Sequence, residues 1–526
     1  MGSNEMIAGR KRASRKLGRV LILGLGKSGK VAAEYCAGLL GSRVDSLAIA
    51  AGAESDDSRA FADSIVSCAS CADPCVYEFG DAAVPVLAKQ AGGHFDLCIA
   101  SPGIPYWADL YQDALAYSTE VVSEVEFAWR ESAEGSKWVA ITGTNGKTTT
   151  TSCCASLIRA GGLRASAVGN IGDVCLKAVA DGETDVYVAE VSSYQLASTK
   201  DFAPDVAVCL NITPDHIHWH KTLAAYRDAK FQVLANLANT PDSLAVLDAT
   251  NDVVRAKVRE LKALTAQERG FDYVPMGTST GWSGDMREAC GAENAAFIDD
   301  AGALTVALHG VEHVLCRADE LKIHGIHNAS NALAAAVAAV AVGVPDAAIS
   351  AALIAFEPLE HRIEPCGEID GVRCFNDSKA TNVDATMKAL AAFPADRPIV
   401  LLGGDDKGTD LSELVSKAYE HAGAVVCFGA AGPRFADAFK ASSDAAPEGF
   451  DVYQAGNMRE ALDCALAHAH AGDVVLLSPA CASFDEFHSF EERGKVFKQL
   501  VESRAKAVGR PLSGTTCEPG AKPPRS

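Results

Sequence analysis

The strongest chemical signal in the sequence is the turn Gly146-Lys147-Thr148, which follows the apolar residues 138–142. A turn of this kind between a strand and a helix presents backbone amides, an ammonium group and a hydroxyl group, which together hold nucleotide phosphates and a metal ion. The standard spacing would place a glycine where this chain has Ile141. A chance Gly-Lys-Thr turn is the alternative, and the preceding strand and the polar pair Thr144-Asn145 argue against it. The turn therefore predicts phosphoryl transfer.

A second glycine-rich turn occurs near the start of the chain. Gly24, Gly26 and Gly29 follow the apolar residues 20–23, and a helical pattern then continues to Leu40. Such a turn lets a phosphate approach backbone amides at a helix N-terminus, as in nucleotide-binding folds. A plain strand-to-helix turn, packed closely because it lacks side chains, explains the glycines equally well. Both interpretations stay open on this pattern alone.

The elements that position these turns fall into three modules in which apolar strands alternate with helical segments. The expected strands after the first are residues 138–142, 186–191, 206–212 and 244–247 in the second module, and 399–402, 425–428, 452–454 and 474–477 in the third. This alternation predicts parallel sheets. We expect an α/β protein with a Rossmann-like N-terminal domain (18–136), a central P-loop ATPase-type α/β domain (137–357) and a Rossmann-like C-terminal domain (358–505). An N-terminal extension (1–17) precedes them, and a disordered tail (506–526) follows.

Composition narrows the class of protein. The chain has 526 residues, a formal net charge of -21, 48% hydrophobic residues and 22% charged residues. The negative charge argues against a nucleic-acid partner, because phosphate backbones are bound by clustered lysine and arginine. No apolar run approaches the roughly 20 residues that cross a bilayer, so we expect a cytoplasmic protein with no membrane partner. We also expect a monomer.

The cysteines carry little functional signal. The chain has 17 of them, scattered and without a secretion signal, which favours reduced and mostly buried thiols. Cys68, Cys71 and Cys75 are spaced like metal ligands but lack an obvious fourth ligand. A zinc or iron-sulfur site is therefore the less favoured interpretation of this cluster.

The phosphate-loop sequence resembles that of the Mur ligases and of the related folylpolyglutamate synthetases. Further stretches that look like Mur ligase signatures follow in the same order: Gly169-Asn170-Ile171-Gly172, Glu190-Val191-Ser192-Ser193-Tyr194-Gln195, Asp215-His216 and His327-Asn328-Ala329-Ser330-Asn331-Ala332. Two C-terminal stretches, residues 376–382 and 478–485, resemble the family members that add D-glutamate. The resemblance spans roughly residues 18–503. It implies an ATP-dependent ligase that joins D-glutamate to UDP-N-acetylmuramoyl-L-alanine through an acyl phosphate.

The resemblance also implies roles for residues of the central module. The ATP-binding set would be Gly143, Thr144, Asn145, Gly146, Lys147, Thr148 and Thr149, with Asn328, Arg362 and Asp377 at the nucleotide. Lys147 would hold the β- and γ-phosphates, and Thr148 and Glu190 would bind a first Mg²⁺ ion. His216 would bind a second Mg²⁺ ion together with Lys230, which family members carbamylate.

Several of these residues have ordinary alternatives. Glu190 could be a surface acid at a strand end, and Lys230 a solvated lysine on a helix expected over residues 222–237. His216, His218 and His220 lie at a period of two and could form a zinc cluster, although magnesium prefers oxygen ligands. The family usually has aspartate where this chain has His218.

The two remaining substrates are assigned to the outer modules. The UDP-substrate set implied by the resemblance is Lys27, Ser28, Ser101, Pro102, Gly103 and Asn170. Asp45 is either a contact near the uracil or a plain surface acid. The D-glutamate set is Lys379, Thr381, Lys407, Ser483 and Phe490, for which helix caps and core packing are the alternative.

Two rival functions have different signatures. Another ligase of the same architecture, such as a folylpolyglutamate synthetase, is opposed by the stretches around Thr381 and Ser483. A protein that only senses ATP or UDP-sugars would be expected to lose Lys147, Glu190 or His216, and all three are present.

Overall fold

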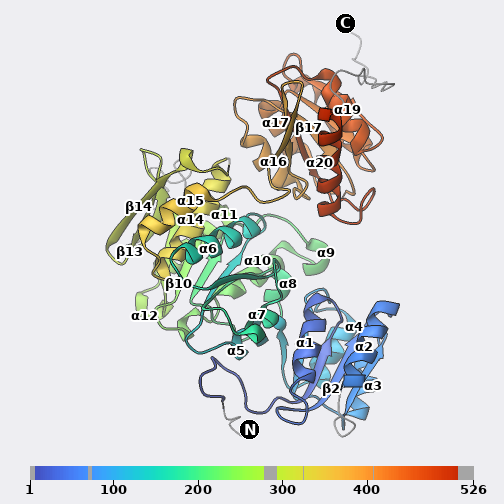
Figure 1. The fold of residues 1–526 in the computed structure, drawn as a ribbon, viewed down its shortest axis with the longest axis vertical. Coiled ribbons are helices and arrows are strands. Elements are labelled where there is room, and N and C mark those ends of the chain that lie inside the picture. Colours follow the sequence, from blue (N-terminus) through green and yellow to red (C-terminus); the bar gives the residue numbers. More distant parts are fainter. Residues whose placement is uncertain (1–5, 69–73, 278–292, 324, 407, 507–526) are drawn as a thin grey trace. The chain divides into compact units, whose positions relative to one another are not determined.

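The computed structural model describes residues 6–68, 74–277, 293–323, 325–406 and 408–506, which form three parallel-rich β-sheets flanked by helices (Figure 1). They belong to two compact units. The first consists of Met1–Leu321 and Ser330–Ala355 and holds two sheets, and the second consists of Lys322–Ala329 and Phe356–Ser526 and holds the third. The α/β fold with three modules is thus confirmed, whereas the exact domain boundaries stay predictions.

The first sheet has five parallel strands in the order β3-β2-β1-β4-β5. Its strands are β1 (Gly18–Leu23), β2 (Val44–Ala51), β3 (Cys75–Phe79), β4 (Leu97–Ala100) and β5 (Val121–Ser123), and its helices are α1 (Lys27–Ala37), α2 (Asp56–Cys68), α3 (Ala83–Gln90), α4 (Asp109–Tyr117) and α5 (Glu124–Glu131). The strand order reverses between β1 and β4, and such a reversal opens a crevice at the carboxyl ends of the two strands. The helix expected to reach Leu40 ends at Ala37, where Gly38 follows.

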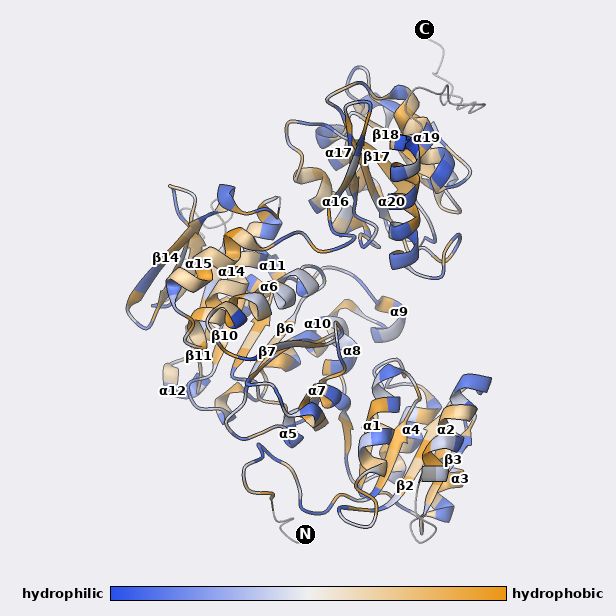
Figure 2. Ribbon diagram, in the orientation of Figure 1, coloured by the Kyte–Doolittle hydropathy of each residue, from blue (hydrophilic) through white to orange (hydrophobic). Residues whose placement is uncertain are grey.

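The second sheet has nine strands in the order β14-β13-β12-β11-β10-β9-β6-β8-β7. They are β6 (Lys137–Thr142), β7 (Ala165–Gly169), β8 (Val186–Glu190), β9 (Val206–Cys209), β10 (Leu244–Asp248), β11 (Asp272–Gly277), β12 (Ala295–Ile298), β13 (Ala303–Leu308) and β14 (Val311–Arg317). Only the pairs made by β13 are antiparallel. The strands from β6 to β10 are mainly hydrophobic (Figure 2), as expected where helices cover both faces of a parallel sheet.

The helices of this module are α6 (Lys147–Ala160), α7 (Cys175–Asp181), α8 (Ser193–Leu196), α9 (Ile217–His220), α10 (Leu223–Phe231), α11 (Asp252–Ala263), α12 (Ala266–Arg269), α14 (Ile326–Ala341) and α15 (Asp346–Ala355). The helix expected over residues 222–237 is shorter than predicted. Thr222 caps it by accepting a hydrogen bond from the Ala225 amide, and short 3-10 turns replace it after Phe231. No helix among the described residues is long and apolar enough to cross a membrane.

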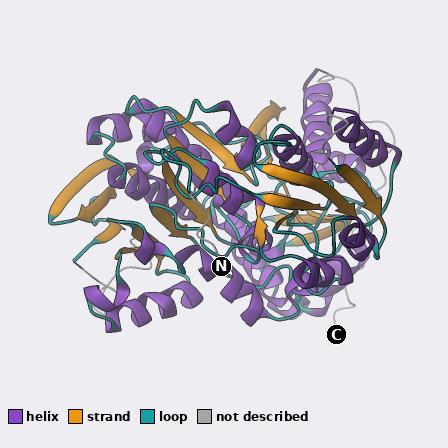
Figure 3. Cartoon of the chain, turned by 90° about the horizontal axis from the view of Figure 1, so that it is seen from below, coloured by secondary structure: helices purple, strands orange, loops and turns teal. Residues whose placement is uncertain are grey.

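The third sheet, in the second unit, has six strands in the order β15-β16-β20-β17-β18-β19. Its strands are β15 (Glu364–Ile369), β16 (Val372–Asn376), β17 (Ile399–Gly403), β18 (Ala424–Phe428), β19 (Asp451–Gln454) and β20 (Val474–Ala480), and its helices are α16 (Val383–Ala391), α17 (Ser412–His421), α18 (Gly432–Ala441), α19 (Met458–His468) and α20 (Phe490–Lys506). Only β15 is antiparallel to its neighbour. Figure 3 shows the helices and strands of the chain by type.

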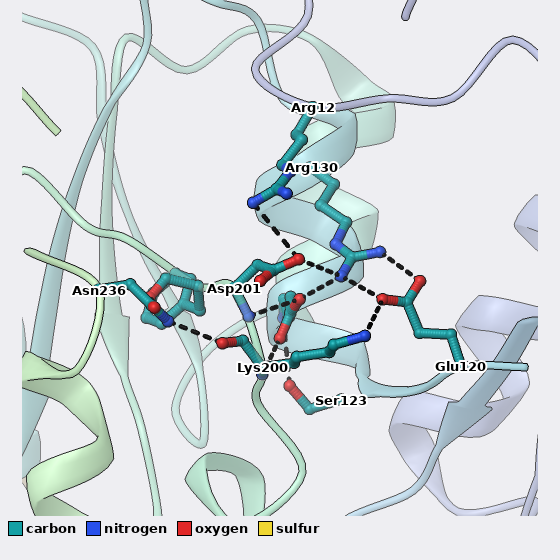
Figure 4. Close-up of polar contacts among 9 residues, drawn as sticks. Arg12, Glu120, Ser123, Arg130, Lys200, Asp201 and Asn236 are labelled. Carbon is teal, nitrogen blue, oxygen red and sulfur yellow. Dashed lines mark hydrogen bonds and ion pairs between the residues drawn. The ribbon is translucent and has the colours of Figure 1, made fainter. Parts of the chain in front are cut away.

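A network of ion pairs joins the first sheet to the central module within the first unit (Figure 4). Arg130 on α5 donates to Glu120 at 2.8 Å and forms an ion pair with Asp201 at 3.3 Å. It also pairs with Glu126, whose side chain is fully buried. Arg12 from the N-terminal segment reaches Asp201 at 3.3 Å. The network therefore anchors both α5 and the N-terminal segment to the central module.

Replacing Arg130 with methionine is expected to destabilise the protein by about 3 to 5 kcal/mol, because it leaves the buried Glu126 carboxylate without its ion-pair partner. Among the described residues, only the backbone amides of Lys200 and Asp201 then remain as donors to that carboxylate. The midpoint of thermal unfolding measures this loss. Arg227→Met is the matched control, since Arg227 pairs with Asp228 at an exposed site and should change stability by only about 0.5 kcal/mol. Equal shifts in the two variants would contradict a structural role for the network.

Candidate active site

The predicted phosphate loop connects the end of β6 to the start of α6. Gly146 is the N-cap of α6 and has a left-handed backbone with φ of 86°. A side chain at this position would also approach the Asn331 Oδ1 atom to 2.3 Å, so the loop requires glycine here. The amides of the first helical turn lack intrahelical partners and form an anion-binding end.

The loop is held by the segment that follows β9. The Thr144 amide donates to the Asn211 carbonyl at 2.7 Å, and the Asn145 amide donates to the Asn211 side-chain oxygen at 2.8 Å. The Thr144 hydroxyl lies 2.9 Å from the Tyr226 hydroxyl and accepts from the Thr213 amide at 3.0 Å. These bonds fix the backbone of the loop before any ligand binds.

Two lysines meet at the Gly143 carbonyl. Lys147 Nζ donates to the carbonyl oxygens of Gly143 and Thr144, each at 2.9 Å. Lys230 Nζ donates to the same Gly143 oxygen at 2.7 Å and lies 4.8 Å from the centre of the Tyr226 ring. Lys230, which is 87 positions beyond Gly143 in the sequence, is thus brought to the phosphate loop.

Lys230 is not the solvated helix lysine that the sequence left open as an alternative, because only 2% of its surface is exposed. Burial lowers its pKa well below the usual lysine value, and the neighbouring Lys147 ammonium lowers it further. Both effects favour the neutral amine.

Glu190 is not a surface acid either. It ends β8 and is 2% exposed, and its neighbour across the sheet is Ile141 of β6, so the carboxylate lies at the same sheet edge as the phosphate loop. Asn170 donates to its Oε1 atom at 2.7 Å, whereas its Oε2 atom is buried with no hydrogen-bond partner among the described residues. Leaving a buried carboxylate oxygen unpaired is costly, so the site fits a cation.

His216 is the N-cap of α9 and has a left-handed backbone with φ of 53°. Its ring lies 4.9 Å from the Tyr194 ring, and its amide donates to the Asp215 carboxylate at 2.8 Å. His220 instead contacts the Ser193 hydroxyl at 2.9 Å. The His216 and His218 rings lie 6.3 Å apart. No group of three His, Cys, Asp or Glu side chains in the described ranges could hold a metal ion, so the zinc-cluster alternative is not supported.

The predicted UDP-substrate residues of the first module meet at the reversal of its strand order. Lys27 and Ser28 begin α1 after β1, and Ser101-Pro102-Gly103 follows β4. The Ser101 hydroxyl donates to the Gly24 carbonyl at 3.1 Å, and a side chain at Gly29 would come within 1.9 Å of the Gly24 oxygen. Close packing thus explains Gly29, and both loops lie at the carboxyl ends of β1 and β4, where a reversal of strand order usually opens a crevice.

Lys27 and Asp45, both considered as contacts of the UDP-substrate, lie at opposite ends of the first sheet. Lys27 Nζ donates to the Gly172 carbonyl at 2.8 Å, which links the first module to the turn that carries Asn170. Asp45 is at the start of β2, at the edge opposite the crevice, where it pairs with Lys16 at 3.0 Å. Its alternative as a surface acid is therefore the one that fits the structure.

The second unit gathers its own polar residues at the carboxyl ends of β16, β17 and β20. Asp377 follows β16 and accepts from the Ser478 hydroxyl at 2.7 Å and from the Ile363 amide at 3.3 Å. Burial raises its pKa to about 7. Arg362 and Asn328 also belong to this unit.

Four of the predicted D-glutamate residues lie in the segments that follow β16 and β20, up to the start of α20. Lys379 Nζ lies 3.6 Å from the centre of the Phe490 ring, and the Thr381 amide donates to the Lys379 carbonyl at 2.9 Å. Ser483 follows β20 and is 2% exposed. Lys407 lies outside the described residues.

Comparisons with known proteins match both halves of this arrangement. Residues 141–339 match the Mur ligase middle domain, and residues 361–481 match the Mur ligase glutamate ligase domain. The UDP-N-acetylmuramoylalanine-D-glutamate ligase of Pelotomaculum thermopropionicum is 38% identical over 417 residues, which cover 78% of this chain and 84% of the relative. The chain belongs to the Mur ligase family.

A second relative supports this Mur ligase assignment, and two solved structures share the fold. The enzyme of the same name from Salinibacter ruber is 39% identical over 436 residues, which cover 81% of this chain and 87% of the relative. A pseudomurein peptide ligase type C from Methanothermus fervidus has the same fold, with a TM-score of 0.52 at 16% identity, covering 92% of this chain and 99% of that one. The MurF protein of Acinetobacter baumannii has a TM-score of 0.52 at 17% identity, and the match covers 78% of this chain and 91% of that one.

One residue of this Mur ligase escaped the sequence analysis. Arg493 on α20 is 1% exposed, and it donates to the carbonyls of Ser378, Cys481 and Ala482 at 2.8, 3.0 and 3.0 Å. Its guanidinium therefore joins the loop after β16 to the loop after β20. An arginine in a polar helical pattern gives no sign of this burial, because the three carbonyls come from distant segments.

The cysteines in the described part of the chain show no sign of a metal site. The described cysteine side chains are all free thiols, and most are buried, as expected. Burial raises the pKa of Cys75 to about 11. Cys71 and the side chain of Cys68 lie outside the described part of the chain, so the structure does not test the less favoured metal site at Cys68, Cys71 and Cys75.

Proposed function

We propose that this Mur ligase joins D-glutamate to UDP-N-acetylmuramoyl-L-alanine, with ATP converted to ADP and phosphate, during the synthesis of peptidoglycan precursors. The observation that carries the proposal is the 38% identity over 417 residues to a ligase of that name. Dependence on ATP and Mg²⁺ follows from membership of the family. The monomeric state and the cytoplasmic location remain predictions.

The chemistry requires activation of a carboxylate, since a carboxylate does not react with an amine at neutral pH. An oxygen of the L-alanyl carboxylate attacks the γ-phosphorus of ATP, and ADP leaves. The D-glutamate amine then adds to the acyl phosphate, and the tetrahedral intermediate expels phosphate as the amide forms. Such a reaction depends mainly on positioning and on stabilisation of negative charge.

In our proposal the phosphate loop both positions the reacting groups and stabilises the negative charge. Amides at the start of α6 and the Lys147 ammonium bind the β- and γ-phosphates. Lys147 now donates to two loop carbonyls, and exchanging these for phosphate oxygens brings its charge onto the transferred group. The fixed backbone of Thr144 and Asn145 keeps the donors in place during transfer.

The metal ligands fit the same edge of the sheet. The unpaired Oε2 atom of Glu190 and the Thr148 hydroxyl would hold one Mg²⁺ ion. His216 and carbamylated Lys230 would hold a second ion. Bound magnesium neutralises phosphate charge and polarises the transferred group.

Carbamylation is proposed because an ammonium group repels a cation and has no lone pair to donate. The neutral Lys230 amine attacks carbon dioxide and loses a proton, which converts a neutral amine into a negatively charged carbamate. The burial of Lys230 and its position beside Gly143 support the proposal of a carboxylate at the phosphate loop.

The outer modules would bind the remaining substrates. Lys27, Ser28 and the Ser101-Pro102-Gly103 loop line the crevice for the UDP moiety, and Asn170 extends this set toward Glu190. In the second unit, Asn328, Arg362 and Asp377 would contact the nucleotide. Lys379, Thr381, Lys407, Ser483 and Phe490 would form the D-glutamate pocket.

Thr381→Ala and Ser483→Ala are each expected to raise the KM for D-glutamate by a factor that corresponds to about 1 to 3 kcal/mol, since each removes a donor to a ligand carboxylate. The KM for ATP should change little. Ser443→Ala, at an exposed turn of the same unit, is the control. Parallel increases in all three substrate KM values would instead indicate a structural role.

The proposed function is tested by measuring phosphate release with UDP-N-acetylmuramoyl-L-alanine, ATP and Mg²⁺ while the amino acid is varied among D-glutamate, L-glutamate, L-lysine and L-alanine. Release that depends on D-glutamate is the expected result. Release with another amino acid alone would identify a sibling ligase, and no release with any of them would indicate a binding protein.

A further inference from the structure

A pair of large aromatic residues ends the loop that begins with Ser101. Tyr106 and Trp107 are 37% and 45% exposed, yet both contact the central module. The Trp107 indole N–H donates to the Trp219 carbonyl at 2.8 Å, and the Tyr106 ring meets the Trp219 ring edge-on at 5.6 Å. Lys221 Nζ lies 3.5 Å from the centre of the Trp107 ring. Three different contacts therefore join this loop to α9.

The helix at the other side of these contacts needs external support. α9 has four residues, which is too short to be stable alone. His216 before it and Lys221 after it both have left-handed backbones, with φ of 53° and 68°. Such conformations are costly for residues other than glycine and persist only where the surroundings impose them. The contacts from Trp107 and Tyr106 are well placed to impose this conformation.

The contacts continue from α9 to His216. The Trp219 ring lies 4.8 Å from the Tyr194 ring, which in turn lies 4.9 Å from the His216 ring. The Trp219 amide also donates to the His216 carbonyl at 3.0 Å. A change at Trp107 can thus reach His216 by two routes. One passes through the rings of Trp219 and Tyr194, and the other passes through Trp219 and one turn of backbone.

We propose that Tyr106, Trp107, Trp219 and Lys221 form an aromatic latch that positions His216 according to the state of the UDP-substrate loop. This inference rests on the proposed function, in which the Ser101-Pro102-Gly103 loop binds the UDP moiety and His216 binds a metal ion. Occupation of the crevice fixes the loop, and the latch transfers that order to α9. Trp107 is a positioning residue, since it acts through His216.

The latch has a measurable consequence for metal use. In Trp107→Ala, the Mg²⁺ concentration that gives half-maximal velocity is expected to rise about tenfold, the size of a typical coupling between sites. The Kd for UDP in Mg²⁺-free buffer, measured by calorimetry, should stay within about twofold of the wild-type value. Trp107→Phe keeps a ring but removes the N–H donor. Its Mg²⁺ concentration for half-maximal velocity should therefore lie between the values for the wild type and for Trp107→Ala. Leu115→Ala, at an exposed apolar site of the same module, should behave as wild type.

A double-mutant cycle separates positioning from a general loss of structure. In a His216→Ala background, Trp107→Ala should add almost nothing to the change in Mg²⁺ dependence, because the residue through which it acts is already absent. Additive effects in the cycle, or a wild-type Mg²⁺ dependence in Trp107→Ala, would overturn the latch. Failure of the proposed function is distinct, because the wild-type enzyme would then release no phosphate with D-glutamate.

Discussion

Replacing Lys147 with alanine removes ATP turnover while leaving UDP-N-acetylmuramoyl-L-alanine bound, according to the arrangement of the first unit. Lys147 Nζ lies on the phosphate loop, whereas the predicted UDP-substrate residues lie at the ends of β1 and β4. Loss of the ammonium removes charge stabilisation that is needed only as the γ-phosphoryl group moves. We expect a fall in kcat of about 100-fold or more, the effect of removing one preorganised charge-stabilising donor.

Phosphate release and calorimetric binding of the UDP-substrate measure the two halves of this prediction. Lys177→Ala is the control, since Lys177 forms an exposed pair with Asp181 in the same unit. A Lys147→Ala enzyme that forms acyl phosphate at nearly the wild-type rate would show that the loop is not the phosphate site.

Lys230→Ala is expected to lose most of its activity and to recover part of it when a short carboxylic acid such as acetate is added. The variant opens space beside Gly143, and an acid bound there restores the carboxylate that the carbamate would supply. A role as a structural lysine predicts loss of activity without rescue.

Two comparisons sharpen this experiment. Acetate should leave the Lys177→Ala control unchanged, which excludes a general effect of the added salt. Lys230→Arg keeps a basic side chain but cannot be carbamylated in the same way, so full activity in that variant would contradict the proposal. Activity of the wild-type enzyme should also fall when bicarbonate and carbon dioxide are removed.

The sequence predicted those parts of the fold and the site that depend on local pattern. Strands such as 138–142 and 474–477 are continuous apolar runs, and both are strands of the structure, since burial on two faces leaves a strong signal. The phosphate loop is equally local, because its glycines, lysine and hydroxyl are contiguous. The predicted roles of these site residues remain to be tested by the variants above.

The sequence could not supply the contacts that join distant segments. Lys230 reads as an ordinary helix lysine, and only the approach of Gly143 shows that it is buried. The sequence also left Asp45 open between a ligand contact and a surface acid, and only the fold shows that it lies at the start of β2, where it pairs with Lys16. Arg493 and Trp107 act on backbone carbonyls, whose positions no residue type encodes.

The most direct test of the central claim follows oxygen from substrate to product. UDP-N-acetylmuramoyl-L-alanine labelled with ¹⁸O in its carboxylate is incubated with the enzyme, ATP, Mg²⁺ and D-glutamate, and the released phosphate and the nucleotide product are analysed by mass spectrometry. The account predicts that each phosphate carries one ¹⁸O atom and that the product has gained one glutamate in amide linkage. Release of unlabelled phosphate during amide formation would contradict an acyl-phosphate ligase.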